Sequence, residues 1–192
     1  TPLYSSAASD VYKRQRKGAV TSRLVEHYVR RSKALGLLII EHSYVSLDGK
    51  LGERQLGIYD GKLAKGLRKL ANSVHAIGTP VVIQINHAGS RTTVEVTGMQ
   101  PVAPSPSENT RELKINEIEA LVDAFALAAE RAMKAGFDGV EVHGAHGFLL
   151  NQFFSPLANR RRDGYGGSLE NRMRFPLEVV ERVKEKVGDK LL

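Results

Sequence analysis

Two histidines placed directly after a short apolar strand are the residues best suited to do chemistry. The strand is expected at 139–142, and His143 and His146 follow it three residues apart. Two imidazoles with this spacing can donate hydrogen bonds to one carbonyl oxygen and stabilise negative charge that develops on it. They can also bind a metal ion, with His87 as a third ligand, or one of them can be an internal hydrogen-bonding residue. Their position at a strand end favours a functional pair.

Two further polar side chains lie inside or just after predicted apolar strands. Gln84 lies inside the run 81–85, and His42 follows the run 37–40. A buried amide needs hydrogen-bonding partners. A planar ligand rich in donors and acceptors would supply them, and so would a water molecule or a backbone group. Gln84 is therefore an open candidate for ligand binding, and His42 is a weaker one of the same kind.

The segment 159–168 is dense in Arg, Asp, Tyr and Gly. Two glycines before a helix can expose backbone N–H groups to a phosphate. The favoured interpretation is a structural turn that an Arg–Asp pair locks in place, with Ser168 as the helix N-cap.

The elements that must position these side chains alternate along the chain. Apolar runs predict strands at 37–40, 81–85 and 139–142. Helical spacing of apolar residues predicts four helices, from 21 or 22 to 36, from 60 to 78, from about 116 to 136, and from 168 onward with a kink or restart at Pro176. This alternation indicates a parallel sheet, either open or closed into a barrel. In both cases ligands bind at the carboxyl ends of the strands, where the candidate residues lie.

Composition places the chain among ordinary globular proteins. It has 192 residues, of which 42% are hydrophobic and 26% are charged, and it has no Cys. The sequence therefore has no disulfides or Cys-based metal sites, and it contains no apolar run of the roughly 18 residues that span a bilayer. A cytoplasmic location without membrane contact is the expectation.

The net charge of +7 raises the alternative of a basic binding module for a polyanion. Eight basic and two acidic side chains fall within residues 1–35, so most of the excess lies in the leader and the first helix. A basic face of this kind is usually just solvated, and nucleic-acid binding is not expected. Residues 1–17 have no sustained periodicity and are interpreted as a disordered or foreign leader, followed by one domain at 18–192.

Several ordered motifs resemble one enzyme family. They are LLIIEHSYV at 37–45, VVIQINHAG at 81–89, PVAPSPS at 101–107 and GFDGVEVHGAHGFLLNQFFSPLANRRRDGYGGSLENRMRFPLEVV at 136–180. Together they are similar to the old yellow enzyme family of FMN-dependent ene reductases, also called NADH:flavin oxidoreductases. The resemblance covers nearly the whole chain after the leader.

The resemblance implies an eight-stranded TIM (β/α)8 barrel with FMN at its mouth, of which this chain holds about three strands and four helices. It makes His143 and His146 the pair that holds the carbonyl oxygen of an α,β-unsaturated substrate. It makes Gln84 a partner of the flavin ring and His42 a residue that lines the cofactor pocket. Hydride passes from NAD(P)H to FMN and then to the substrate β-carbon, so the expected partners are small molecules.

The chain departs from the family pattern in two respects. Phe148, a substrate-binding position, stands where the family commonly has a Tyr that protonates the α-carbon, and a phenyl ring cannot donate a proton. The first barrel strand and the later strands with their phosphate-binding loops are also missing from the pattern. We therefore interpret the chain as an internal fragment that binds FMN weakly or not at all by itself, with a homo-oligomer possible for the full-length protein. The metal-dependent hydrolase with His143, His146 and His87 stays open as an alternative.

Overall fold

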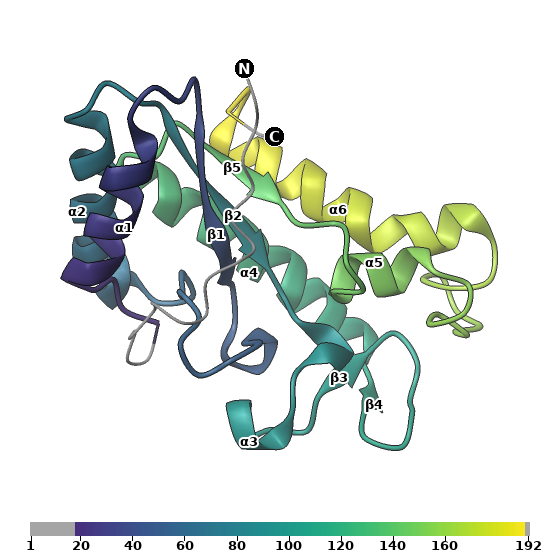
Figure 1. Cartoon of the computed structure of the whole chain (residues 1–192). Helices are drawn as coiled ribbons and strands as arrows, with labels where there is room; N and C mark the ends of the chain where they lie inside the picture. Colours follow the sequence, from purple (N-terminus) through teal and green to yellow (C-terminus); the bar gives the residue numbers. More distant parts are fainter. Residues whose placement is uncertain (1–17, 191–192) are drawn as a thin grey trace.

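The computed structural model describes residues 18–190 and shows a three-stranded parallel sheet (Figure 1). The strands are β1 (Leu38–Tyr44), β2 (Val81–Asn86) and β5 (Gly139–Val142), and β2 lies between the other two. These are the three strands that the sequence predicts, and their parallel pairing confirms the alternating architecture. The expected leader at 1–17 lies outside the described residues.

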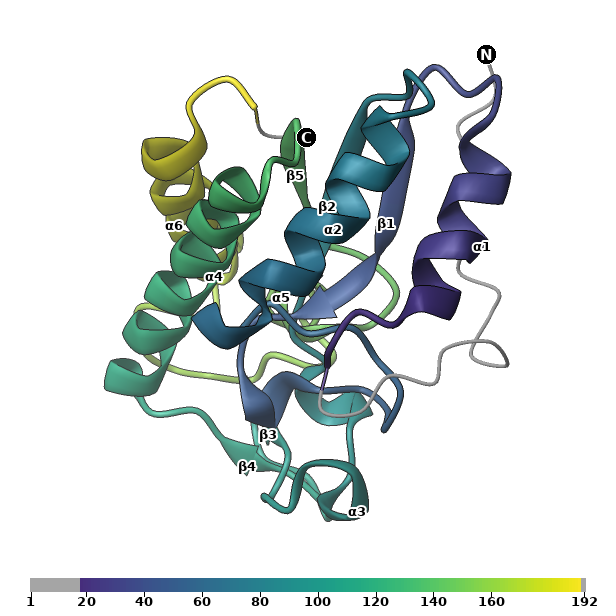
Figure 2. The same cartoon turned by 90° about the vertical axis from the view of Figure 1, so that its left-hand side faces the viewer.

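Four long helices form a layer against one face of this sheet. They are α1 (Ser22–Ser32), α2 (Ala64–His75), α4 (Ile115–Ala135) and α6 (Leu169–Val187). Figure 2 shows them side by side, and each packs against the next in the order α1, α2, α4, α6. None of the helices between residues 18 and 190 is long and apolar enough to cross a membrane.

The helix layer holds the sheet through alternate strand residues. Ile83 and Ile85 of β2 and Val140 of β5 are completely buried among apolar side chains of the helices, among them Leu67 and Phe125. Burial of each large aliphatic side chain contributes about 1.5–3 kcal/mol relative to exposure. The face that carries Gln84 is the opposite one, because side chains alternate along a strand.

Local signals set most helix ends as expected. The Thr21 hydroxyl accepts a hydrogen bond from the Leu24 N–H at 3.2 Å, and the Ser168 hydroxyl caps α6 in the same way. The first helix, however, ends at Ser32 and not at Gly36 as predicted. Ala34 takes the left-handed conformation, with φ of 64°, and turns the chain toward β1 before Gly36 is reached.

The expected restart at Pro176 is wrong, because α6 continues from Leu169 to Val187 with Pro176 inside it, and a kink there stays a prediction. The Pro176 ring is buried, and α6 packs along α4 and α5. Apolar packing of the whole helix thus compensates for the backbone hydrogen bond that proline cannot make.

The first strand is longer than predicted and irregular. It continues through Tyr44, and its register with β2 shifts between Ile40 and Ser43. The reason is a contact from the helix layer, since the Glu41 N–H donates to the Tyr28 hydroxyl oxygen at 2.9 Å. This bond takes the place of a ladder bond and produces a bulge that contains Glu41 and His42.

Short elements fill the connections at the carboxyl ends of the strands. The structure contains η1 (Leu47–Gly49), η2 (Gly61–Leu63), η3 (Gly89–Arg91), α3 (Val94–Thr97), the paired strands β3 (Val102–Ala103) and β4 (Arg111–Glu112), and α5 (Leu149–Phe154). η2 lies at the start of the helix predicted from 60, and the Asp60 carboxylate caps it as expected by accepting from the Lys62 N–H at 2.9 Å. The other short elements are not predicted from the sequence. Segments this short are set by tertiary contacts and carry little periodicity.

Candidate active site

His143 lies at the carboxyl end of β5 and is buried, with 6% of its surface exposed. Its backbone N–H donates to the Ile85 carbonyl of β2, which fixes it beside the middle strand. Its Nδ1 accepts a hydrogen bond from the Ala145 N–H at 3.2 Å. A neutral imidazole that accepts at Nδ1 carries its proton on Nε2. His143 therefore presents an N–H donor.

The imidazole of His143 is neutral at physiological pH. Burial, together with the nearby His146, lowers the pKa of His143 to about 4. The two rings are 5.1 Å apart between centroids and nearly perpendicular, at 78°. The sequence-predicted pair is thus brought together, with one neutral buried ring and one exposed ring.

His146 sits in a strained turn. Its φ of 58° is left-handed, a conformation that costs a non-glycine residue about 1–3 kcal/mol and that clusters at functional sites. Gly147 follows with φ of 71°, and its N–H donates to the Asn151 Oδ1 at 2.9 Å. Two consecutive left-handed residues turn the chain sharply from β5 into α5 and hold the His146 side chain at the surface.

Gln152 of α5 ties this turn to the loop that follows β2. Its Nε2 donates to the carbonyl oxygens of Gly147, at 2.7 Å, and Ala88, at 3.2 Å. Its Oε1 accepts from the Ser90 N–H at 3.2 Å. Gln152 is not among the residues predicted from the sequence. A Gln among buried apolar residues of 149–153 is the one signal that could have drawn attention to it.

Phe148 is the centre of a cluster of rings. It is 4.8 Å from His143 in an edge-to-face arrangement at 89°, and 5.3 Å from His42 between centroids. The guanidinium carbon of Arg91 lies 5.8 Å from the centre of the same ring. The phenyl ring thus joins side chains from three strand ends, and it offers no O–H group to a ligand.

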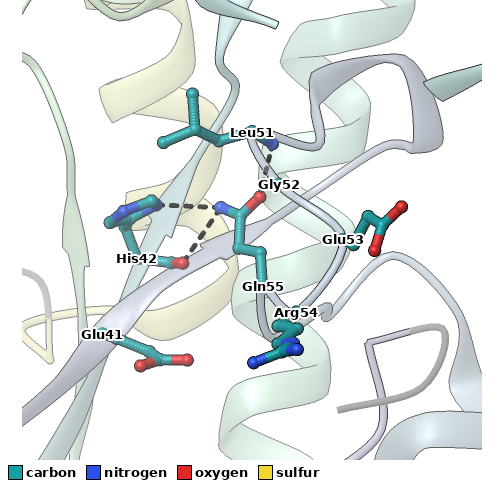
Figure 3. Close-up of a pocket in the computed structure, with 7 residues that line it drawn as sticks. All are labelled: Glu41, His42, Leu51, Gly52, Glu53, Arg54 and Gln55. Atoms are coloured by element: carbon teal, nitrogen blue, oxygen red, sulfur yellow. Dashed lines mark hydrogen bonds between the residues drawn. The ribbon is translucent and has the colours of Figure 1, made fainter. Parts of the chain in front are cut away.

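His42 reaches the cluster from the bulge of β1, with its ring 6.1 Å from that of His143. On its other side it borders a cavity of about 360 Å³ (Figure 3). The lining residues are Glu41, His42, Leu51, Gly52, Glu53, Arg54 and Gln55. His42 therefore lines this cavity and also contacts the ring of His143.

Gln84 lies on the sheet face that the helix layer leaves uncovered. It is half-buried and stands in register with Glu141 of β5. Asn86, two residues further along β2, is 1% exposed. Among residues 18–190, the Oδ1 of Asn86 and the Oε2 of Glu141 are buried without a hydrogen-bond partner. Buried polar atoms of this kind indicate a partner that lies outside the described chain.

His87 makes its polar contacts with the loop after β2 and with η1. Its Nδ1 accepts from the Gly89 N–H at 3.0 Å, and its Nε2 lies 3.4 Å from the Asp48 carboxylate, in ion-pair range but outside hydrogen-bond geometry. Burial raises the pKa of Asp48, but the interactions with His87 and Ser46 and a backbone hydrogen bond together outweigh it, and the pKa falls below its usual range. Within residues 18–190, no group of three or more His, Cys, Asp or Glu is placed to hold a metal ion. The metal-site alternative thus lacks a third ligand there.

The segment 159–168 is the locked turn that the sequence favours. The Arg161 guanidinium is buried, donates to Asp163 at 2.6 Å, and also donates to the carbonyl oxygens of Pro104 and Leu113. The Gly166 N–H bonds the Asp163 carbonyl. The backbone donor of Gly166 is thus already used inside the turn.

Parallel strands with helices against one face and polar side chains at their carboxyl ends define part of a (β/α)-barrel enzyme. The sequence model of the NADH:flavin oxidoreductase / NADH oxidase family matches residues 4–192, and the chain belongs to this family.

Relatives and solved structures agree with this assignment. The chain is 49% identical to an NADH oxidase of Thermoanaerobacter brockii (90% of this chain, 28% of the relative), and 43% identical to an NADPH dehydrogenase of Clostridium acetobutylicum (91% and 53%). It superposes on an old yellow enzyme homologue from Zymomonas mobilis with a TM-score of 0.89 and 33% identity (93% and 55%). Its superposition on morphinone reductase in complex with tetrahydroNAD has a TM-score of 0.88 and 35% identity, and it covers 93% of this chain and 56% of that chain. The chain spans about half or less of the relatives' lengths, which confirms a partial TIM barrel.

Proposed function

We propose that this chain forms the carbonyl-binding part of an FMN-dependent oxidoreductase that reduces α,β-unsaturated carbonyl compounds with hydride from NAD(P)H. The observation that carries the proposal is the meeting of His143, His146 and His42 around Phe148, next to a sheet face with unpartnered polar atoms. Family membership supports the flavin, and the tetrahydroNAD complex of morphinone reductase supports the nicotinamide donor.

The polar atoms of the uncovered sheet face fit a flavin ring. Isoalloxazine carries N–H and C=O groups along one edge, and such groups would bond the Gln84 amide and the orphaned Asn86 Oδ1. We propose Gln84 and His42 as the residues that hold the ring, with Asn86 beside them. When bound, FMN supplies a ring that takes hydride from NAD(P)H and delivers it to the β-carbon of the substrate.

The histidine pair acts on the substrate oxygen. The Nε2–H of His143 is fixed as a donor because its Nδ1 already accepts from Ala145. His146, from the adjacent turn, supplies the second hydrogen bond. As hydride reaches the β-carbon, negative charge develops on the carbonyl oxygen, and two donors aimed at that atom stabilise the enolate. Because the pKa of His143 is about 4, the ring works as a neutral donor at pH 7.

Phe148 shapes the site without taking part in proton transfer. Its ring packs against His143 and carries no exchangeable proton. We propose that the α-carbon receives its proton from solvent or from another residue, and the exposed position of His146 in this chain supports solvent as the source. Deuterium from D2O would enter the product at the α-carbon.

The test replaces both histidines by Ala in the full-length protein. The double variant His143→Ala/His146→Ala should keep FMN bound, retain bleaching of the flavin by NAD(P)H, and lose reoxidation by an enone by about 10²-fold or more. His75→Ala is the matched control, because His75 pairs with Asp138 on the helix layer, away from the site. Unchanged enone turnover in the double variant would remove the assigned role.

The FMN assignment has its own control. A full-length protein that retains stoichiometric zinc or manganese and no flavin would contradict it and would favour the hydrolase. A cytoplasmic location and a homo-oligomeric state are proposed for the full-length protein as well, and size-exclusion chromatography with light scattering measures the second.

A further inference from the structure

Gln55 has an amide orientation that its neighbours determine. Its Oε1 accepts a hydrogen bond from the Leu51 N–H at 2.6 Å (Figure 3). Its Nε2 consequently faces His42, where it lies 2.8 Å from Nδ1 and 3.1 Å from the backbone oxygen. Turning the amide over would place its Nε2 against the Leu51 N–H and its oxygen against the His42 carbonyl. Both contacts are repulsive, so only one orientation satisfies all three.

The fixed amide determines which nitrogen of His42 carries the proton. Because Gln55 Nε2 can only donate, His42 Nδ1 must accept, and a neutral ring then has its proton on Nε2. The Asn86 Nδ2 lies 3.5 Å from the same Nδ1 and is at the limit of a hydrogen bond. The shorter contact with Gln55 decides the tautomer. Gln55 is itself 8% exposed, so water competes little for this bond.

We propose that Gln55 is a positioning residue that holds His42 in the Nε2–H tautomer, so that β1 presents a hydrogen-bond donor to the acceptor oxygen or nitrogen of the bound ligand. The ligand half of this proposal rests on the proposed function. The acceptor can belong to the flavin ring or to the substrate carbonyl, because both carry hydrogen-bond acceptor atoms that can face His42.

The arrangement repeats that of His143 on β5. His143 also accepts at Nδ1, from the Ala145 N–H, and also carries its proton on Nε2. The two rings are 6.1 Å apart and both contact Phe148. Two neighbouring imidazoles held as donors make this end of the sheet suited to a ligand with acceptor groups and to negative charge on oxygen.

The tautomer can be measured directly in the 192-residue chain. Long-range ¹H–¹⁵N NMR distinguishes a protonated ring nitrogen from an unprotonated one, and loss of a signal in His42→Asn assigns His42 among the six histidines. At pH 7.5 the chain should show a protonated Nε2 and an unprotonated Nδ1 for His42. In Gln55→Glu, a carboxylate oxygen replaces the donor, and the proton should move to Nδ1 in most molecules.

The controls separate positioning from folding. Arg54→Gln changes a neighbour that lines the same cavity and should leave the tautomer as it is. A protonated Nδ1 in the unaltered chain, or an unchanged tautomer in a folded Gln55→Glu, would overturn the proposal. If Gln55→Glu fails to fold, the measurement on the unaltered chain alone still decides it.

The ligand half is tested in the full-length protein. Gln55→Glu should weaken either FMN binding or the enone KM by about tenfold, and whichever constant changes identifies the acceptor. If neither constant changes while the tautomer does, the ligand half is wrong. The flavin assignment would be unaffected, because bleaching by NAD(P)H measures it independently.

Discussion

The two faces of one three-stranded sheet differ in how completely the chain satisfies them. On the helix-covered face, Ile83, Ile85 and Val140 are fully buried among apolar side chains of the chain itself. On the uncovered face, Asn86 and Glu141 hold buried oxygen atoms without a partner among residues 18–190. The first face contributes stability, and we propose that the second binds the ligand. An orphaned buried polar group costs about 1–3 kcal/mol, which is tolerable when a ligand later bonds it.

The largest expected difference between the two faces is in the free energy of unfolding, and substitutions at two adjacent positions of β2 measure it. Ile83→Ala leaves a cavity in the core and should lower the free energy of unfolding by about 2–5 kcal/mol. Gln84→Ala, one residue further, should change it by about 0.5 kcal/mol or less, because its amide makes no hydrogen bond with other residues between 18 and 190. Chemical denaturation followed by circular dichroism measures both. Equal losses would show that the uncovered face also belongs to the core.

The next largest expected effect is a loss of stability at acidic pH that comes from His143. The pKa of His143 is about 4 in the folded chain and near 6.5 when unfolded, so the unfolded chain binds the proton first. Stability should be constant above about pH 6.5, fall as the pH drops toward 4, and level off below. Carboxylates with lowered pKa values, such as Asp48 and Asp163, lose their contributions only below this window. His143→Asn should flatten the fall, and an unchanged slope would locate the titrating group elsewhere.

The smallest effect concerns ligand affinity. In the full-length protein Gln84→Ala should weaken FMN binding by about tenfold, the value of one hydrogen bond. Flavin fluorescence measures the affinity, and the exposed Gln100→Ala serves as the matched control. A loss of affinity in Ile83→Ala as large as in Gln84→Ala would mean that the two faces are not independent.

Sequence reasoning succeeded where a feature depends on local pattern. Continuous apolar runs located β2 and β5, and capping residues located the starts of α1 and α6. The pairing of His143 with His146 followed from their position after a strand. The resemblance of ordered motifs to a known family then added the partial barrel, which the structural neighbours confirm.

The remaining features depend on contacts between distant residues. The bulge of β1 was missed because the Glu41 N–H bonds the hydroxyl of Tyr28, 13 residues away, and the strand resumes beyond the bulge to Tyr44. Gln55 gave no signal in the sequence, since its role appears only when a loop brings it to His42. Gln152 was missed for the same reason, because it bonds residues as far as 64 positions away. None of these contacts produces a periodic pattern.

The left-handed backbone of His146 has a consequence for how this position can change. Glycine adopts such a φ at no steric cost, so replacing His146 by Gly would relax the turn. A library at this position selected only for folding would be enriched in Gly and Asn, whereas one selected for turnover in the full-length enzyme would be enriched in residues with a ring N–H. The order of preferred residues at position 146 would therefore differ between the two libraries. That difference would show that His146 is kept for activity, although its backbone conformation favours Gly or Asn.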